Sequence, residues 1–283
     1  MRACEIANAH NCPWRIPAIR ALELNWLNTL AGFGVGVMVG ITGVGGGSLM
    51  TPILVLLFGV APAAAIGTDL WFAAITKTVG GSIHHRLGSV DWQVLRRMWL
   101  GSLPASILTL LWMQHSGIGQ RKPQVLLVAL GVVLLVTSIA MLFMARTHAF
   151  ARNLRTTSPD RFRFLQPSLT VLAGAMLGFL VTLTSVSAGA LGTALLLYIY
   201  PLRMKAARLV GTDIVHAIPV TIVAGTGYML MGNVNFTLLG NLLLGSIPGI
   251  VLSSLLASKA REGALRTAIA VLLVVVGIKL VMT

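Results

Sequence analysis

Residues 40–50 read Gly-Ile-Thr-Gly-Val-Gly-Gly-Gly-Ser-Leu-Met, and residues 182–192, 142 positions later, read Thr-Leu-Thr-Ser-Val-Ser-Ala-Gly-Ala-Leu-Gly. Four pairs are identical in this register: Thr42/Thr184, Val44/Val186, Gly47/Gly189 and Leu49/Leu191. Three more pairs follow at an offset of 144: Gly67-Thr68-Asp69 with Gly211-Thr212-Asp213, Gly88-Ser89-Val90-Asp91-Trp92 with Gly232-Asn233-Val234-Asn235-Phe236, and Gly101-Ser102-Leu103-Pro104 with Gly245-Ser246-Ile247-Pro248. One two-residue insertion explains the change of offset, so the chain consists of two related halves.

The composition is that of a membrane protein. Hydrophobic residues make up 56% of the chain and charged residues 10%, whereas a soluble domain is about 25% charged. Apolar runs of about 20 residues suit helices rather than barrel strands, which predicts an all-α integral membrane protein. The net charge is +14, and the basic residues lie between the apolar runs. This pattern favours basic loops that face the cytoplasm over nucleic-acid binding.

The apolar pattern predicts four regions. We expect a polar N-terminal tail over 1–25, a first transmembrane repeat over 26–145, a basic linker over 146–167 and a second transmembrane repeat over 168–283. The apolar segments are 26–58, 60–83, 98–113, 124–145, 168–200, 209–231, 236–257 and 267–282.

The first segment of each half is too long for one simple crossing. Segments 26–58 and 168–200 would each form a helix about 50 Å long, whereas the hydrocarbon core is about 30 Å thick. Each is interrupted near its middle, by Gly45-Gly46-Gly47 and by the stretch 185–189. Because glycine runs weaken helices, each half is expected to open with a broken or re-entrant helical segment, followed by about three transmembrane helices.

Loop charges favour inverted repeats. The loop at 59–63 has no Lys or Arg, but its counterpart contains Arg203, Lys205 and Arg208. The loop at 84–97 is basic, whereas its counterpart at 232–235 is not. By the positive-inside rule, this swap predicts that the halves have opposite orientations in the membrane.

The paired breaks are the first candidate site. Helix N-termini and glycine-rich backbone present N–H groups to an anion, and neighbouring hydroxyls add donors. The candidate substrate-binding residues are Thr42, Gly43, Gly45, Gly46, Gly47, Ser48, Thr184, Ser185, Ser187 and Gly189. The alternative is that these small residues only allow close helix packing.

Four ionisable residues form the second candidate, for coupling to protons or sodium. Asp69 and Asp213 occupy the same repeat position, Lys77 follows Asp69 by eight residues, and His216 follows Asp213 by three. Ionisable groups within a membrane usually mark ion or proton paths. The alternatives are that the aspartates cap helices, that Lys77 extends to the interface and that His216 is structural.

The sequence contains little that indicates catalysis or a metal. Cys4 and Cys12 lie in the tail without a ligand pattern, so no metal or cofactor is expected. Ser187 with His216 could be read as an intramembrane serine hydrolase pair. No Gly-x-Ser-x-Gly or His-Glu-x-x-His motif is present, and we expect no enzyme activity.

The glycine-rich stretch 40–47 ahead of Pro52, then Gly67-Thr68-Asp69, and the second-half stretch 184–189 together resemble the TauE/SafE sulfite exporter family, over about residues 26–282. The resemblance implies a multi-pass transporter of the bacterial inner membrane that exports a small sulfur-containing anion, such as sulfite or an organosulfonate. It places the paired breaks at 42–48 and 184–190. Ser187 departs from this pattern, because glycine is common there.

Two questions stay open at this stage. Alternating access coupled to the proton gradient is the expected mechanism, and a passive anion channel is the alternative. The small-residue face of Gly32, Gly36 and Gly40 would pack helices within one chain or between two copies in a homodimer.

Overall fold

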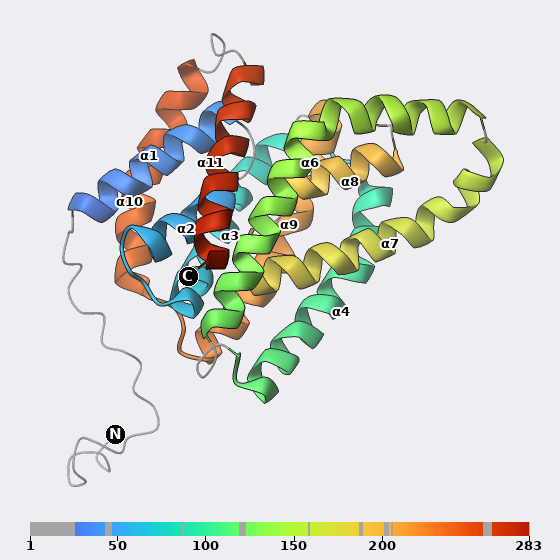
Figure 1. Cartoon of the computed structure of the whole chain (residues 1–283). Coiled ribbons are helices and arrows are strands. Elements are labelled where there is room, and N and C mark those ends of the chain that lie inside the picture. The colour runs from blue at the N-terminus through green and yellow to red at the C-terminus, as the bar shows by residue number, and fades with distance from the viewer. Residues whose placement is uncertain are drawn as a thin grey trace, which may run out of the picture.

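Helices and short connections between them make up the part of the chain that the computed structural model describes, which is residues 26–42, 47–86, 88–118, 123–157, 159–186, 189–200, 204, 206–256 and 262–282 (Figure 1). The helices are α1 (Trp26–Thr42), α2 (Gly47–Leu56), α3 (Pro62–Arg86), α4 (Trp92–Ser116), α6 (Pro123–Thr157), α7 (Pro159–Thr184), α8 (Ala190–Ile199), α9 (Ala206–Leu230), α10 (Phe236–Leu256) and α11 (Glu262–Met282). The predicted all-α class is confirmed.

Both over-long segments are divided in two. In the first half α1 ends at Thr42 and α2 begins at Gly47; in the second α7 ends at Thr184 and α8 begins at Ala190. Ser185 adopts a φ of 57°, a left-handed conformation that cannot continue a right-handed helix. The short helices α2 and α8 therefore begin inside the apolar segments, as the sequence predicts.

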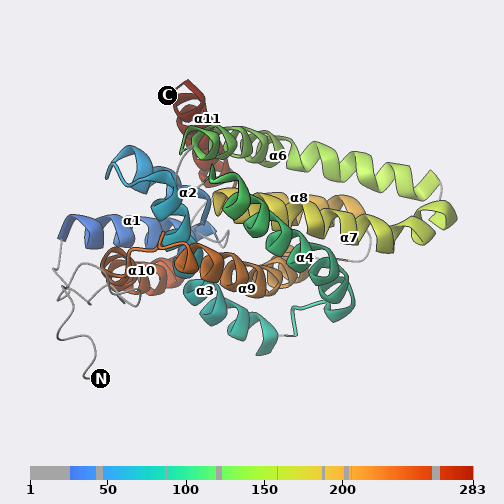
Figure 2. The same ribbon diagram turned by 90° about the horizontal axis from the view of Figure 1, so that it is seen from below.

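Three longer helices follow each short one, α3, α4 and α6 in the first half and α9, α10 and α11 in the second. The basic stretch 146–167 lies largely on helices, because α6 runs to Thr157 and α7 begins at Pro159. These two helix ends project together to one side of the molecule (Figures 1 and 2).

Among the described residues, four helices are long and apolar enough to cross a membrane by length and composition. The spans are Pro123–Ala140, Leu165–Thr184, Arg208–Leu230 and Phe236–Ser253, on α6, α7, α9 and α10. Helix α3 is as long as α9, at 25 residues, but contains three charged residues, Asp69, Lys77 and Arg86, where α9 contains two. The chain is a multi-pass membrane protein.

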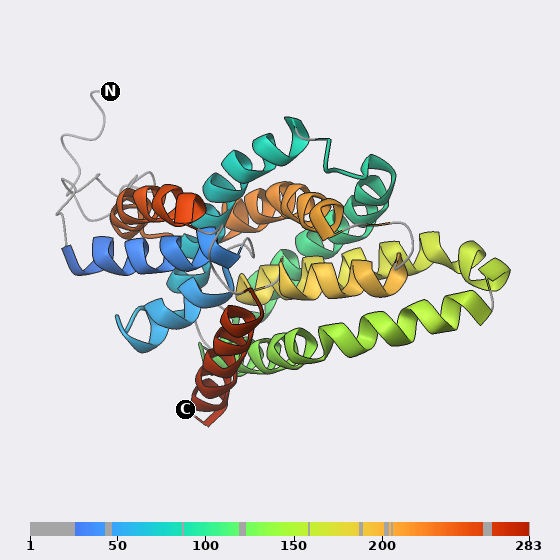
Figure 3. The ribbon, with the colours of Figure 1, turned by 90° about the horizontal axis from the view of Figure 1, so that it is seen from above.

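The two halves pack through reciprocal helix pairs. Helix α1 packs on α10, and its repeat equivalent α7 packs on α4; the equivalents α3 and α9 contact each other, as do α6 and α11 (Figure 3). Small residues permit the close approaches: a Cβ on Gly36 would overlap the Ser246 carbonyl, and one on Gly178 would overlap the equivalent Ser102 carbonyl. Each half therefore completes its packing only against the other.

Hydrogen bonds between the halves are reciprocal too. The Asp91 backbone N–H donates to Thr212 Oγ1 at 3.0 Å, and the equivalent Asn235 N–H donates to Thr68 Oγ1 at 3.1 Å. Asp91 and Asn235 then accept from the N–H groups of Val94 and Leu238, three residues later. Each is an N-cap, so the repeated Gly-Thr-Asp motif fixes where α4 and α10 begin.

Candidate functional site

Asp69 lies on α3 in the centre of the bundle, where it is completely buried. Its Oδ2 atom accepts a hydrogen bond of 2.5 Å from the Thr51 hydroxyl of α2. The Ser185 hydroxyl, from the break in the second half, lies beside the same carboxylate without forming a hydrogen bond of normal geometry. The carboxylate of one half therefore meets the break of the other.

Asp213, its repeat equivalent on α9, is 1% exposed. Its carboxylate faces the Gly189 backbone and reaches the first turn of α8, where a Cβ on Gly192 would overlap Oδ1. The N-terminal N–H groups and dipole of a helix stabilise negative charge. Met50 occupies the equivalent position in the first half, so only the second half allows this approach.

Lys77 supplies the positive charge of this cluster and is 6% exposed. It follows Asp69 by about two helical turns, on the face of α3 that packs against α9. Its ammonium interacts electrostatically with both carboxylates. This burial does not fit the alternative in which Lys77 extends to the interface. Its repeat equivalent is the buried Thr221, whose hydroxyl donates to the Ala217 carbonyl.

His216 is held against α4. Its Nε2 lies 3.0 Å from Ser102 Oγ, and Trp99 Nε1 donates to its backbone carbonyl at 3.2 Å. Its Nδ1 is buried without a hydrogen-bond partner, and Lys77 acts on the ring electrostatically. The imidazole is thus oriented by a hydrogen bond at one nitrogen only.

The break residues divide into several groups. Thr184 uses its hydroxyl within the break, donating to the Leu180 carbonyl and bonding to the backbone of Val186. Ser185 and Gly189 lie beside the two aspartates. Thr42 ends α1, and Gly47 and Ser48 begin α2. Gly43, Gly45, Gly46 and Ser187 lie outside the described residues.

Three buried oxygens near the breaks lack a hydrogen-bond partner: Asp69 Oδ1, Asp213 Oδ1 and Ser185 Oγ. Burying a polar atom without a partner is costly, so their grouping indicates a place where a further proton or ligand is accommodated. The aspartates also face the N-terminal parts of α2 and α8, which is the position expected of residues that cap these helices. Capping and ligand binding are compatible, because each carboxylate has an Oδ1 atom without a hydrogen-bond partner.

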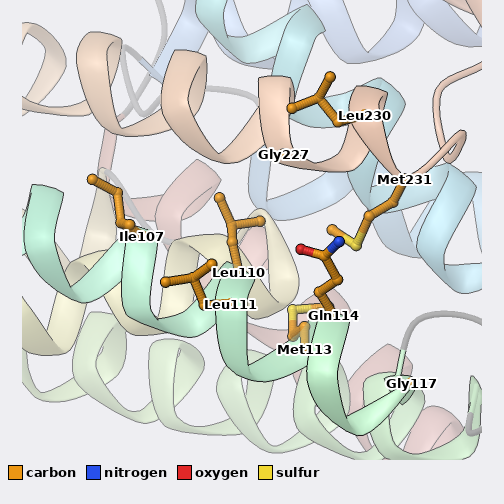
Figure 4. A pocket seen from close by; sticks show the side chains of 9 residues that line it. All are labelled: Ile107, Leu110, Leu111, Met113, Gln114, Gly117, Gly227, Leu230 and Met231. Carbon is orange, nitrogen blue, oxygen red and sulfur yellow. The ribbon is translucent and has the colours of Figure 1, made fainter.

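A separate groove of about 550 Å³ opens between the C-terminal ends of α4 and α9 (Figure 4). Leucine and methionine side chains line it together with the Gln114 amide, and Leu111 and Leu230 are largely exposed. No charged residue lines the groove. An anion would find almost no donors there, so this surface suits lipid tails, and the charged cluster is the better candidate site.

Sequence reasoning did not single out Thr51, Trp99 or Ser102. Two of them carried a usable signal: Thr51 recurs as Thr193 at the same offset of 142, and Ser102 belongs to the repeated Gly-Ser-x-Pro motif. Trp99 carried none, since its contact with the His216 carbonyl depends on how α4 crosses α9.

Comparison with known proteins shows the family of this chain. The model of the family described as "Sulfite exporter TauE/SafE" matches residues 28–280, nearly the whole chain outside the tail. The chain belongs to the TauE/SafE family. The resemblance noted in the sequence is therefore confirmed.

Two relatives of this TauE/SafE protein cover most of its length. It is 36% identical to the probable membrane transporter protein YjnA of Bacillus subtilis, over 89% of this chain and 98% of that one. It is 26% identical to the probable membrane transporter protein MJ0441 of Methanocaldococcus jannaschii, over 72% of each. No solved structure matches the chain. Family and relatives are both described as transporters, which agrees with the expectation that the chain is no enzyme.

Proposed function

We propose that this protein exports a small sulfur-containing anion, sulfite or an organosulfonate, by alternating access around the place where its two helix breaks meet, coupled to the proton gradient. The observation that carries this proposal is the position of Ser185 beside Asp69. A break in one half and a carboxylate in the other form one buried site. A site at the interface of two repeats is where secondary transporters bind their substrates.

The anion would bind to donors at the breaks. The N-termini of α2 and α8 offer backbone N–H groups. Ser185 adds a hydroxyl that has no hydrogen-bond partner. Lys77 adds the only buried ammonium among the described residues. Donors of this kind suit the oxygen atoms of sulfite and sulfonate, which accept several hydrogen bonds each.

Alternating access would follow from inverted repeats. The reciprocal pairs α1 with α10 and α7 with α4 support a two-fold relation between the halves, and the swapped loop charges support opposite orientations. Labelling of single cysteines with a membrane-impermeant reagent tests the orientation. Residues 203–208 should react only from the cytoplasmic side, and reaction from outside would contradict the inversion.

Ligand-dependent melting of the purified protein tests the substrate class. Sulfite, sulfate, thiosulfate, sulfoacetate and taurine would each be added, because a ligand that binds only the folded state raises the melting temperature. We expect a selective rise for one sulfur oxyanion. Gly46→Leu should abolish it, whereas Gly34→Leu is the control, because a Cβ on Gly34 meets nothing within 4 Å.

The passive channel makes a different prediction. A carrier saturates with substrate and exchanges labelled for unlabelled anion across a vesicle membrane. A channel also passes labelled anion, but it gives no uphill counterflow when the membrane potential is clamped. Flux that rises linearly with anion concentration, with no counterflow, would favour the channel over our proposal.

A further inference from the structure

The buried charges of the site do not cancel. Asp69 and Asp213 carry two negative charges when both are ionised, and Lys77 carries one positive charge. The three side chains lie close enough to interact electrostatically. The empty site with both carboxylates ionised therefore has one net negative charge, in a region where water screens charges poorly.

Other described groups around the carboxylates add no charge of either sign. Asp69 faces the hydroxyls of Thr51 on α2 and Ser185 in the break. Asp213 faces the backbone of Gly189 and Gly192 at α8. The remaining titratable group is His216 on α9, which Ser102 and Trp99 of α4 hold in place.

An anion cannot enter such a site unaccompanied. It would meet two carboxylates that already share the single ammonium, and buried like charges repel strongly. A proton on either carboxylate removes one negative charge and leaves the Lys77 ammonium available to the anion. The unpartnered Oδ1 atoms of both aspartates are where such protons would bind without breaking the Thr51 hydrogen bond.

We infer that the anion binds together with protons, about one for each negative charge that it carries, and that Lys77 is its counter-charge. The protons go to Asp69 and Asp213. This inference rests on the proposed function and makes it more specific. Two carboxylates accept two protons at most, so the site takes monovalent and divalent anions and keeps its net charge unchanged.

The direction of coupling follows. Because the anion and the protons favour each other's binding, they cross the membrane in the same direction. The transported species is equivalent to the neutral acid, so the membrane potential should have little effect on transport, and the pH difference should have a large one. Because export then carries protons outward, an inward proton gradient opposes it, and accumulation of the anion inside the cell supplies the driving force.

Calorimetric titration of the purified full-length protein tests the inference. Thiosulfate, which is divalent, and methanesulfonate, which is monovalent, are titrated in two buffers that differ in ionisation enthalpy, at one pH high enough to ionise both carboxylates of the anion-free protein. The difference in heat gives the protons taken up per anion bound. We expect uptake of about two protons for thiosulfate and about one for methanesulfonate.

Three variants assign the roles. Asp213→Asn should lower the proton uptake with thiosulfate by about one while binding persists. Lys77→Met should weaken binding of both anions by about 100-fold or more, and Lys77→Thr, with the residue of the equivalent position 221, serves if the first variant does not fold. Asp91→Asn is the matched control: Asn235 caps the equivalent helix, so binding and proton uptake should not change.

Each other outcome counts against a stated claim. Anion binding with no proton uptake, or with proton release, overturns the inference and leaves the proposed anion site intact. If proton uptake were unchanged in Asp213→Asn and reduced in His216→Gln, the proton would be assigned to His216, and the role of the aspartate would be overturned. Failure of native protein to bind any sulfur anion would overturn the proposed function and the inference with it.

Discussion

The contacts that hold the two halves together are nearly the same in both directions, whereas the charges between them are not. Gly36 with Ser246 repeats as Gly178 with Ser102. Asp69 likewise repeats as Asp213, but the position equivalent to the buried Lys77 is a threonine, Thr221. The packing contacts are therefore repeated in the two halves, whereas the buried ammonium of Lys77 has no charged equivalent. In the proposed mechanism, the symmetric scaffold changes conformation without favouring either half, and the asymmetric charge provides the anion site.

The largest effect should come from breaking the symmetric scaffold. Leucine at Gly36 or at Gly178 would push side-chain atoms into a carbonyl of the partner helix, which should cost about 3 kcal/mol or more. Both variants should lose most of their folded, monodisperse yield in detergent, and by similar amounts. Gly34→Leu, on the open face of α1, should be unaffected; loss from only one glycine variant would show that the halves are not equivalent.

Moving the charge to the other half tests the asymmetry directly. Lys77→Thr makes the two halves alike and should abolish anion-dependent stabilisation, a loss of about 100-fold or 2.7 kcal/mol. The double variant Lys77→Thr with Thr221→Lys places the ammonium at the equivalent position of α9. Because the scaffold is reciprocal, part of the binding should return, and melting curves with thiosulfate measure it. Full binding by the single variant would contradict the role of Lys77.

The two breaks differ at one residue that can be exchanged cleanly. Ser185 has a φ of 57°, where glycine is unstrained, and Gly43 occupies the equivalent place. Ser185→Gly should thus keep the backbone conformation and remove the hydroxymethyl side chain, with its hydroxyl. We expect about fivefold weaker anion binding, with the melting temperature of the empty protein unchanged. Equal affinity would exclude the hydroxyl from the site.

Ser102 and Ser246 form a matched pair for His216. The Ser102 hydroxyl pairs with His216 Nε2, whereas the Ser246 hydroxyl bonds only to the Leu243 carbonyl of its own helix. Each Ser→Ala change should cost about 1 kcal/mol or less in stability. Only Ser102→Ala should alter how the transport rate depends on pH, by a few-fold at the extremes. Identical pH profiles would make His216 structural.

The smallest effects should come from the two N-caps. Asp and Asn cap helices about equally well, so Asp91→Asn and Asn235→Asp should each change the unfolding free energy by about 0.5 kcal/mol or less. Replacing either residue with alanine should cost about 1 kcal/mol. A large effect of Asp91→Asn on transport, seen in a vesicle assay, would place charge at this cap in the mechanism.

The sequence predicted the fold well because its strongest signals are local. Apolar length, glycine runs and the repeated motifs predicted the helical class, both breaks and the three helices after each. The basic stretch 146–167 was expected to be a linker between the halves, and its residues lie on the ends of α6 and α7. The helical propensity of these residues continues that of the apolar span, so the sequence does not show where the helices end.

The site was predicted in part for a related reason. Asp69, Asp213 and Lys77 could be selected as ionisable residues in apolar segments, but their mutual position depends on how α3 crosses α9, which no local pattern encodes. The roles of Thr51 and Ser102 depend on contacts with other helices. The role of Gly192 could not be predicted either, because it depends on the close approach of the Asp213 carboxylate from another helix.

Counterflow of labelled thiosulfate in proteoliposomes tests the central claim most directly. Vesicles loaded with unlabelled anion would contain either the native protein or Lys77→Thr, after both have been shown to fold and insert equally. We predict transient, saturable accumulation of label with the native protein and none with the variant. Equal counterflow by both proteins would contradict the claim that the buried charge between the two halves is the anion site.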